Sequence, residues 1–200
     1  MVHKPAKKSD RAGAFLLFAI GASLALAVVF GPSLYSTQKR TEGNLTVSNS
    51  PMITETIGQL SSAESSSHRM NAARWLSTQF SNNPETVIRS LGDALNNDPD
   101  PVVRAQAANS LANIARQARD NAAADASEQA QIADLLTKQY RKEASDTVRR
   151  CIIGAAAELD NISAGPLVDE AINDNDPAVK EEALRARLER ERRAQQKKLG

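Results

Sequence analysis

The stretch that decides the fold runs from Leu91 to Ala115 and reads LGDALNNDPDPVVRAQAANSLANIA. Apolar side chains recur at helical spacing from Val87 to Leu95, and NNDPDP then interrupts the pattern with two prolines and several turn-forming residues. A second apolar stripe follows Pro101, and Asp100 is the expected N-cap of that helix. The sequence therefore predicts a helical hairpin, and its two apolar stripes require neighbouring units to bury them.

The same arrangement recurs along the chain. Arg104 is followed by Ala107 and Ala108, three and four positions later, and then by Leu111. Similar patterns begin at Arg69, Arg149 and Lys180, and each follows an apolar helical segment at a corresponding distance. The last copy departs from the pattern because it has Arg187 where a leucine is expected. The chain is thus predicted to contain four hairpins.

The connection between the second and third hairpins is predicted to be longer than the others. The basic residues of these two hairpins, Arg104 and Arg149, lie 45 positions apart, whereas Arg69 and Arg104 lie 35 apart. The insertion falls around Asp120 to Glu128. A surface loop is the favoured interpretation, and a projecting contact element is the alternative.

The motif D-P-x-V-R-x-x-A-A-x-x-L, from Asp100 to Leu111, resembles the short, alanine-rich type of bacterial HEAT repeat. The resemblance covers residues 52–195 and implies an all-α fold, a short α-solenoid in domain 52–200. It also implies a ladder between repeats, in which an acidic residue pairs with the basic residue six positions later. The expected pairs are Asp98 with Arg104, Glu143 with Arg149, and Asp174 with Lys180, while the first copy has Ala63 at the acidic position.

The first fifty residues predict a membrane anchor. Residues 1–11 form a basic tail, and residues 12–35 carry no charged side chain over a length that spans a bilayer as a helix. Residues 36–51 are polar and are interpreted as a linker. Because more positive charge precedes the apolar segment than follows it, the amino terminus is expected in the cytoplasm and the repeats outside it, at the inner membrane of a bacterium.

The apolar segment has two further features. A cleavable signal peptide, with a site at Ala25 to Ala27, is the alternative to an anchor, although the apolar run continues beyond that site to anchor length. Small side chains recur every four residues and are predicted to form a packing face for another transmembrane helix; they are Ala19, Ser23, Ala27 and Gly31.

Composition and motifs argue against several functions. The net charge of +1 gives no overall electrostatic basis for binding nucleic acid, and the 4% aromatic content with abundant alanine disfavours a deep ligand cavity. No metal-binding, phosphate-loop or nucleophile motif is present. The chain is therefore predicted to be no enzyme, to hold no cofactor or metal, and to take no small-molecule substrate. Because some proteins with similar repeats help attach bilin chromophores, a bilin lyase-like enzyme stays as a minor alternative.

Partner contacts are expected on the polar side of the second helices, which commonly line the concave face in HEAT-repeat proteins. The candidates are Asn71, Arg74, Trp75, Thr78, Gln106, Asn109, Asn113, Glu158, Glu182, Arg185 and Glu189. Trp75 either fills the core of the first hairpin or acts as a binding anchor. The basic residues near the carboxyl terminus form either a solvated cap or a site for an acidic partner or lipid headgroup; they are Arg190, Arg192, Arg193, Lys197 and Lys198.

These observations predict a membrane-anchored, protein-binding scaffold, an accessory or assembly subunit of a membrane protein complex. A periplasmic adaptor released by signal cleavage is the runner-up hypothesis.

Overall fold

The computed structural model describes residues 50–120 and 126–199. The predicted basic tail, the predicted transmembrane helix with its packing face at Ala19, Ser23, Ala27 and Gly31, and nearly all of the predicted linker lie outside the described residues. Most of the predicted insertion, residues 121–125, also lies outside them. None of the helices in the described ranges has both the length and the apolarity to cross a membrane.

The described residues fold into α-helices joined by short turns, with no strand among them. The first helices of the successive hairpins are α2 (Pro51–Ser62), α4 (Pro84–Asn97), α6 (Ala126–Lys142) and α8 (Asn161–Ala171). The second helices are α3 (Ser66–Thr78), α5 (Pro101–Asp120), α7 (Asp146–Glu158) and α9 (Pro177–Leu199). A 3-10 turn, η1 (Phe80–Asn82), precedes α4. The four hairpins fit the predicted all-α solenoid.

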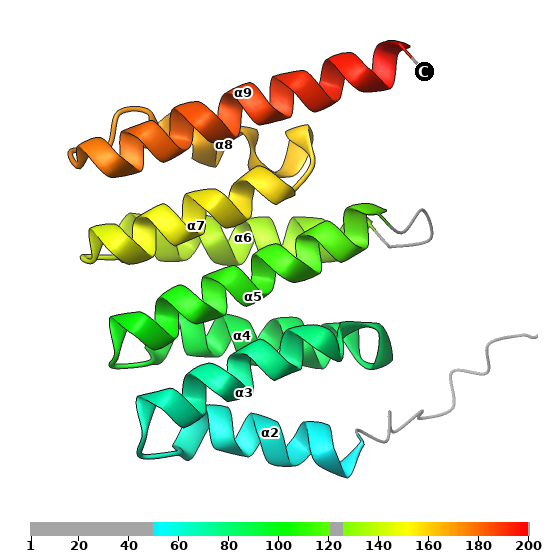
Figure 1. Cartoon of the computed structure of the whole chain (residues 1–200), viewed down its shortest axis with the longest axis vertical. Helices are drawn as coiled ribbons and strands as arrows, with labels where there is room; N and C mark the ends of the chain where they lie inside the picture. Colours follow the sequence, from blue (N-terminus) through cyan, green and yellow to red (C-terminus); the bar gives the residue numbers. More distant parts are fainter. Residues whose placement is uncertain (1–49, 121–125, 200) are drawn as a thin grey trace, which may run out of the picture. The chain divides into compact units, whose positions relative to one another are not determined.

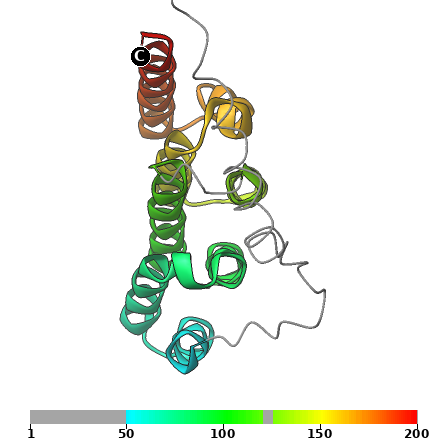
Figure 2. The same cartoon turned by 90° about the vertical axis from the view of Figure 1, so that its right-hand side faces the viewer.

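The hairpins stack into two layers (Figures 1 and 2). The second helices α3, α5, α7 and α9 pack against one another in chain order and form one layer, while α2, α4, α6 and α8 lie behind them. We call the first of these the second-helix layer. Because successive second helices run in the same direction, their amino-terminal ends line one edge of this layer and their carboxyl-terminal ends line the other.

Helix starts follow from the turn residues. Asp100 Oδ1 accepts the Val102 N–H at 2.9 Å, which confirms Asp100 as the N-cap of α5, and Pro101 occupies the first helical position. Asp176 caps α9 in the same way by accepting the N–H groups of Ala178 and Val179. Ser145 caps α7 in a similar way, whereas Ser65 before α3 makes no side-chain capping bond.

The core lies between the two layers and continues through all four hairpins. In α5 the predicted stripe of Val103, Ala107, Leu111 and Ile114 is fully buried. Small side chains bring the helices close together: a Cβ atom added at Gly92 in α4 would lie 2.8 Å from a methyl carbon of Leu135 in α6. The alanine-rich composition thus produces thin, closely packed helices, as the sequence predicts.

The fourth hairpin differs on its outer side. Helix α9 buries Val179, Ala183 and Ala186 against the preceding hairpin, but Leu184 and Arg187 are exposed. Their counterparts in α5, Ala108 and Leu111, are fully buried. Among the described helices only α7 and α8 pack on α9, so a charged residue at position 187 faces solvent and fits a capping role.

Candidate protein-interaction surface

The turns within the hairpins lead into the amino-terminal ends of the second helices, and we call this edge of the second-helix layer the turn edge. Paired arginines and carboxylates join successive repeats along it. Arg69 donates two hydrogen bonds to Asp98, at 2.6 and 2.9 Å. Arg104 donates two to Glu143, at 2.9 and 2.8 Å, and Arg149 donates two to Asp174, at 2.9 and 3.1 Å. We call these three bidentate pairs the turn-edge ladder. Each pair links the second helix of one repeat to the turn of the next.

The pairing expected from the HEAT resemblance is wrong by one repeat. Arg104 does not bond the Asp98 carboxylate; its Nη1 donates to the Asp98 backbone carbonyl at 2.9 Å, while the carboxylate faces Arg69 of the preceding repeat. Arg69 likewise donates to the carbonyl of Ala63 at 2.8 Å. Because the contact within a repeat uses only a backbone carbonyl, an acidic side chain is not required at position 63. Lys180, also expected to pair with Asp174, is exposed instead.

Each ladder carboxylate also closes its own turn. Asp98, Glu143 and Asp174 accept the backbone N–H two residues further along, at 2.9, 3.0 and 2.8 Å respectively. Burial opposes ionisation of Glu143, but hydrogen bonds from Arg104, the Ser145 N–H and Gln139 outweigh it and lower its pKa. The pKa of Asp174 is lowered in the same way, against burial, by Arg149, Tyr140 and the Asp176 N–H.

The ladder is largely shielded from water. Its arginine side chains are 11–16% exposed and its carboxylate side chains 2–7% exposed. With one arginine for each carboxylate and both groups fully engaged, the ladder itself has no surplus charge. The ladder therefore fixes the angle and register between repeats.

The sequence-predicted contact residues do lie along the second-helix layer, with unequal exposure. Five are exposed: Asn71, Arg74, Thr78, Asn109 and Arg185. Six are half-buried: Trp75, Gln106, Asn113, Glu158, Glu182 and Glu189. Trp75 packs against the core, which supports the core interpretation of this residue, and it stays partly accessible from outside.

Several of these polar side chains hold helices together. Asn113 donates to the Ser77 hydroxyl at 3.2 Å, and its neighbour Gln117 donates to the Ser77 carbonyl at 3.2 Å, so both tie α5 to α3. The Ser110 hydroxyl donates to the Ala73 carbonyl at 3.0 Å across the same junction. The layer is thus cross-linked on its polar side as well as at the turn edge.

Arginines gather at the opposite edge, where α5 and α7 end. Glu158, at the end of α7, lies 2.7 Å from Arg119 and 3.5 Å from Arg116, both on α5, and 3.9 Å from Arg193 on α9. Glu189 accepts hydrogen bonds from Arg192 at 2.9 and 2.7 Å and from Arg193 at 2.9 Å. These arginines lower the pKa of Glu189 to about 2. We call Arg116, Arg119, Arg192 and Arg193 the carboxyl-end arginine cluster.

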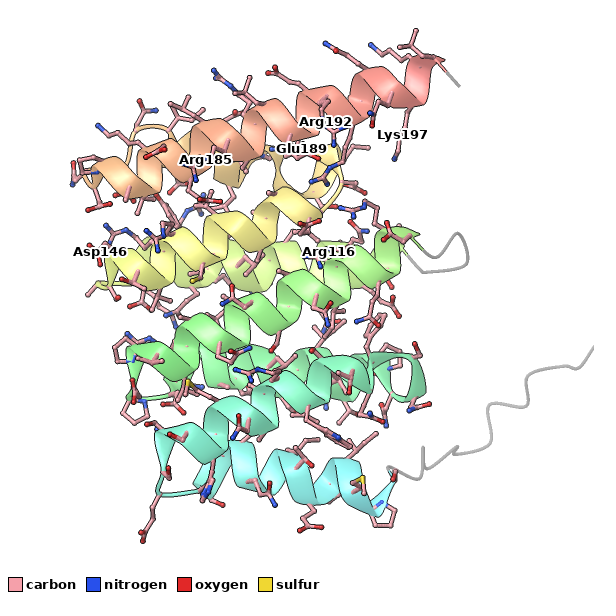
Figure 3. All side chains as sticks on the ribbon, viewed as in Figure 1. Arg116, Asp146, Arg185, Glu189, Arg192 and Lys197 are labelled. Carbon is pink, nitrogen blue, oxygen red and sulfur yellow. The ribbon has the colours of Figure 1, made fainter. Side chains whose placement is uncertain are left out.

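Figure 3 shows Arg116, Arg192 and Lys197 toward the same end of the second-helix layer, away from Asp146. Of the basic residues predicted near the carboxyl terminus, Arg190 does not belong to this surface. It is buried against α8, its Nη1 lies 3.5 Å from the Ala164 carbonyl, and burial lowers its pKa. The remaining arginines of that group, Arg192 and Arg193, lie in the cluster.

Sequence reasoning missed Arg116 and Arg119. Their spacing of three residues, near the end of an apolar helical stripe, places them next to each other on one helix face, and this is the signal from which they could have been found. That signal does not reveal that this face meets the ends of α7 and α9, because the contact depends on the length of α5 and on the stacking angle.

A cleft of about 490 Å³ lies at the other end of the stack, between α2, the start of α3 and the end of α4. Its walls include the Arg69–Asp98 pair together with polar side chains such as Ser62, Asp93 and Asn97. The only arginine in its lining is already engaged by a carboxylate, and none of the sequence-predicted contact residues lines it.

In the part of the chain that the structure describes, no group of three or more His, Cys, Asp or Glu side chains is placed to hold a metal ion. The single cysteine, Cys151, is half-buried, and burial raises the pKa of its thiol.

Comparison with known proteins agrees with the stacked hairpins. No curated protein matches the chain. The family model described as HEAT repeats matches residues 46–130, which include the first two hairpins. Together with the helical stack, this match supports a HEAT-repeat protein.

Proposed function

We propose that this protein is a membrane-anchored scaffold that binds other proteins, as an accessory or assembly subunit of a membrane protein complex. HEAT repeats generally mediate protein–protein interaction, and this is the general basis of the proposal. The observation that carries it here is the second-helix layer, in which four helices pack side by side (Figure 1) and expose polar side chains from all four repeats.

The rigidity of that surface favours binding over catalysis. Three shielded bidentate pairs fix the junctions between repeats, so a partner meets a preformed surface and little conformational entropy is lost on binding. The exposed positions Asn71, Arg74, Asn109 and Arg185 offer hydrogen-bonding groups without a reactive centre among them. We infer that the chain has no enzymatic activity and holds no cofactor.

The membrane part of the proposal rests on the sequence of residues 12–35. Their uncharged, apolar composition and the preceding basic tail support a single-pass anchor with a cytoplasmic amino terminus and extracytoplasmic repeats. A bacterial inner membrane fits this orientation. In this proposal the anchor fixes the repeat domain to the membrane and the solenoid positions a second component.

The test is to place a tag at the carboxyl terminus, extract native membranes with a mild detergent, and determine the mass and composition of the tagged species. A defined larger complex that contains other membrane proteins is the expected result. Recovery of a lone, shortened chain from the soluble fraction would instead indicate the released adaptor and overturn the anchored scaffold. A variant in which another transmembrane helix replaces residues 12–35 tests whether the anchor itself contacts the partner.

A further inference from the structure

We propose that the carboxyl-end arginine cluster is the docking site for an acidic polypeptide segment of the partner, one rich in Asp and Glu. This inference rests on the proposed function and deepens it, because it names the partner's chemistry and the part of the layer that recognises it.

The arginines of the cluster come from two repeats, and a carboxylate of the repeat between them joins them. Glu158 of α7 lies within 2.7–3.9 Å of arginines from both α5 and α9, so the ends of these helices are held around one carboxylate. Arg119 and Arg193 are about one-fifth exposed and are fixed by Glu158 and Glu189. Arg116 and Arg192 are 51% and 56% exposed and border the solvent. A ligand therefore meets the accessible guanidinium groups of Arg116 and Arg192 first, and those of Arg119 and Arg193 lie deeper, already oriented by their carboxylate partners.

The charge balance of this edge is positive. Alongside the four arginines, Lys197 and Lys198 lie in the last turn of α9. The described carboxylates that face these arginines are those of Asp120, Glu158 and Glu189. The four arginines therefore face three carboxylates, whereas the turn-edge ladder has equal numbers of the two groups. Guanidinium groups bind carboxylates in a planar, two-point geometry, so the surplus fits a series of acidic side chains.

A polypeptide fits this geometry better than a bilayer surface does. Arg119 and Arg193 are recessed, and a flat surface would reach only Arg116 and Arg192. Acidic side chains that project from an extended segment can reach the recessed groups as well.

Glu158 acts as an internal competitor for the incoming carboxylates. It accepts hydrogen bonds from Arg119 at 2.7 Å and from Arg116 at 3.5 Å, so a bound segment shares or displaces these contacts. Glu158→Gln removes the charge of this side chain while keeping its shape, so it weakens the hold on both guanidinium groups, although Arg119 still donates to the backbone carbonyl of residue 158 and to Asp120. The inference therefore predicts tighter binding for Glu158→Gln, and a purely structural role for Glu158 would not produce this.

The probe is a short fluorescein-labelled peptide of alternating Glu and Ser, titrated against the full chain in a neutral detergent and followed by fluorescence anisotropy. Arg116→Gln combined with Arg192→Gln is expected to weaken binding about tenfold, and Glu158→Gln to tighten it roughly threefold. The matched control is Arg89→Gln combined with Arg141→Gln. It removes the same net charge from two exposed arginines that pair with Glu85 and Glu170 elsewhere. The control is expected to bind like the unmodified chain. Binding should also weaken steeply between about 0.05 and 0.5 M NaCl.

Equal weakening in the cluster variant and in the control would overturn the inference, because only net charge would then matter. Weaker binding by Glu158→Gln would also overturn it. Soluble short-chain phosphatidylglycerol, compared with phosphatidylcholine of the same chain length, serves as the lipid probe. If the phosphatidylglycerol binds through Arg116 and Arg192 while the peptide does not, the site belongs to a lipid headgroup.

The failure of this inference can be distinguished from the failure of the proposed function. If the tagged cluster variant still recovers the same membrane complex and the peptide does not bind, only the docking site is wrong. If the unmodified chain is recovered alone but binds the peptide at the cluster, the assembly role is wrong and the site stands.

Discussion

The two edges of the second-helix layer use the same residue types in opposite ways. At the turn edge each arginine meets one carboxylate of the next repeat, both groups are shielded, and the pattern repeats at three junctions. The opposite edge holds the carboxyl-terminal ends of the second helices, and we call it the carboxyl edge. There several arginines share Glu158 and Glu189, and two of these arginines are more than half exposed. This arrangement does not repeat along the described part of the stack. The regular, balanced charges of the turn edge stabilise the stack. The irregular charges of the carboxyl edge leave guanidinium groups that a partner can contact.

The difference has a structural origin. At the turn edge the repeat itself sets the positions of the ladder residues, so the same geometry returns in each second helix that carries an arginine at its fourth position. At the carboxyl edge α3 ends at Thr78, whereas α5 continues to Asp120 and so carries Arg116 and Arg119 past the corresponding level. Surface charge at this edge therefore belongs to individual helices and can differ from repeat to repeat.

The largest effect is expected from breaking the ladder. Arg104→Ala leaves Glu143, whose side chain is 2% exposed, without its guanidinium partner. We expect the free energy of unfolding to fall by about 3 kcal/mol, measured by urea denaturation followed by circular dichroism. The exposed pair of Arg89 and Glu85 provides the control, since Arg89→Ala should cost less than about 1 kcal/mol. Equal costs would show that the two kinds of pair do not differ in strength.

The register of the ladder can be tested with two double-mutant cycles. Alanine substitutions of Arg69 and Asp98 should show a coupling energy of about 2 kcal/mol, because these side chains bond directly. The cycle of Asp98 with Arg104 should give less than about 0.5 kcal/mol, because Arg104 uses the backbone carbonyl of residue 98. If the Asp98–Arg104 cycle instead gave the larger coupling energy, the result would support pairing of Asp98 with Arg104 within one repeat and contradict the ladder.

Acid should loosen the turn edge. Because the folded-state pKa values of Glu143 and Asp174 lie below their ordinary values, these groups bind fewer protons in the folded chain than in the unfolded chain. Their stabilisation is present above the unfolded pKa values and is lost as the pH falls below about 5. Urea midpoints at pH 7, 5 and 3 should decrease in that order. Glu143→Gln should show a flatter dependence, and an unchanged slope in this variant would contradict the assignment.

The smallest effect on stability is expected at the carboxyl edge. Arg116→Gln combined with Arg192→Gln should change the free energy of unfolding by less than about 1 kcal/mol, since both side chains are more than half exposed and glutamine keeps part of the apolar stem. The urea midpoint is the measurement. A loss as large as that of Arg104→Ala would mean that this edge also holds the stack together.

The hairpins were predictable because their signals are local. The apolar spacing of Val103, Ala107 and Leu111, with a proline and an aspartate before it, sets both the helix and its start without knowledge of any other repeat. The ladder was only half predictable. Its residues are visible in the sequence, but the acid nearest to Arg104 along the chain is not its partner, because stacking brings Glu143 to Arg104 and Asp98 to Arg69.

The carboxyl-end arginine cluster was the least predictable feature. Arg119 and Glu158 lie 39 positions apart, and no repeat pattern relates them. Their contact follows from the length of α5 and the stacking of α7 on it, which side-chain periodicity does not encode. The same limit applies to Arg190, which charge alone placed on the surface but which packs against α8.

The most direct test of this division between the edges compares Glu143→Gln with Glu158→Gln, measuring for each variant the urea midpoint and the dissociation constant for the Glu-Ser peptide. We expect Glu143→Gln to lower stability by about 2 kcal/mol without changing peptide binding. Glu158→Gln should change stability by less than about 1 kcal/mol and tighten binding roughly threefold. If Glu143→Gln changes peptide binding, if Glu158→Gln lowers stability as much as Glu143→Gln does, or if Glu158→Gln weakens binding, the account is contradicted.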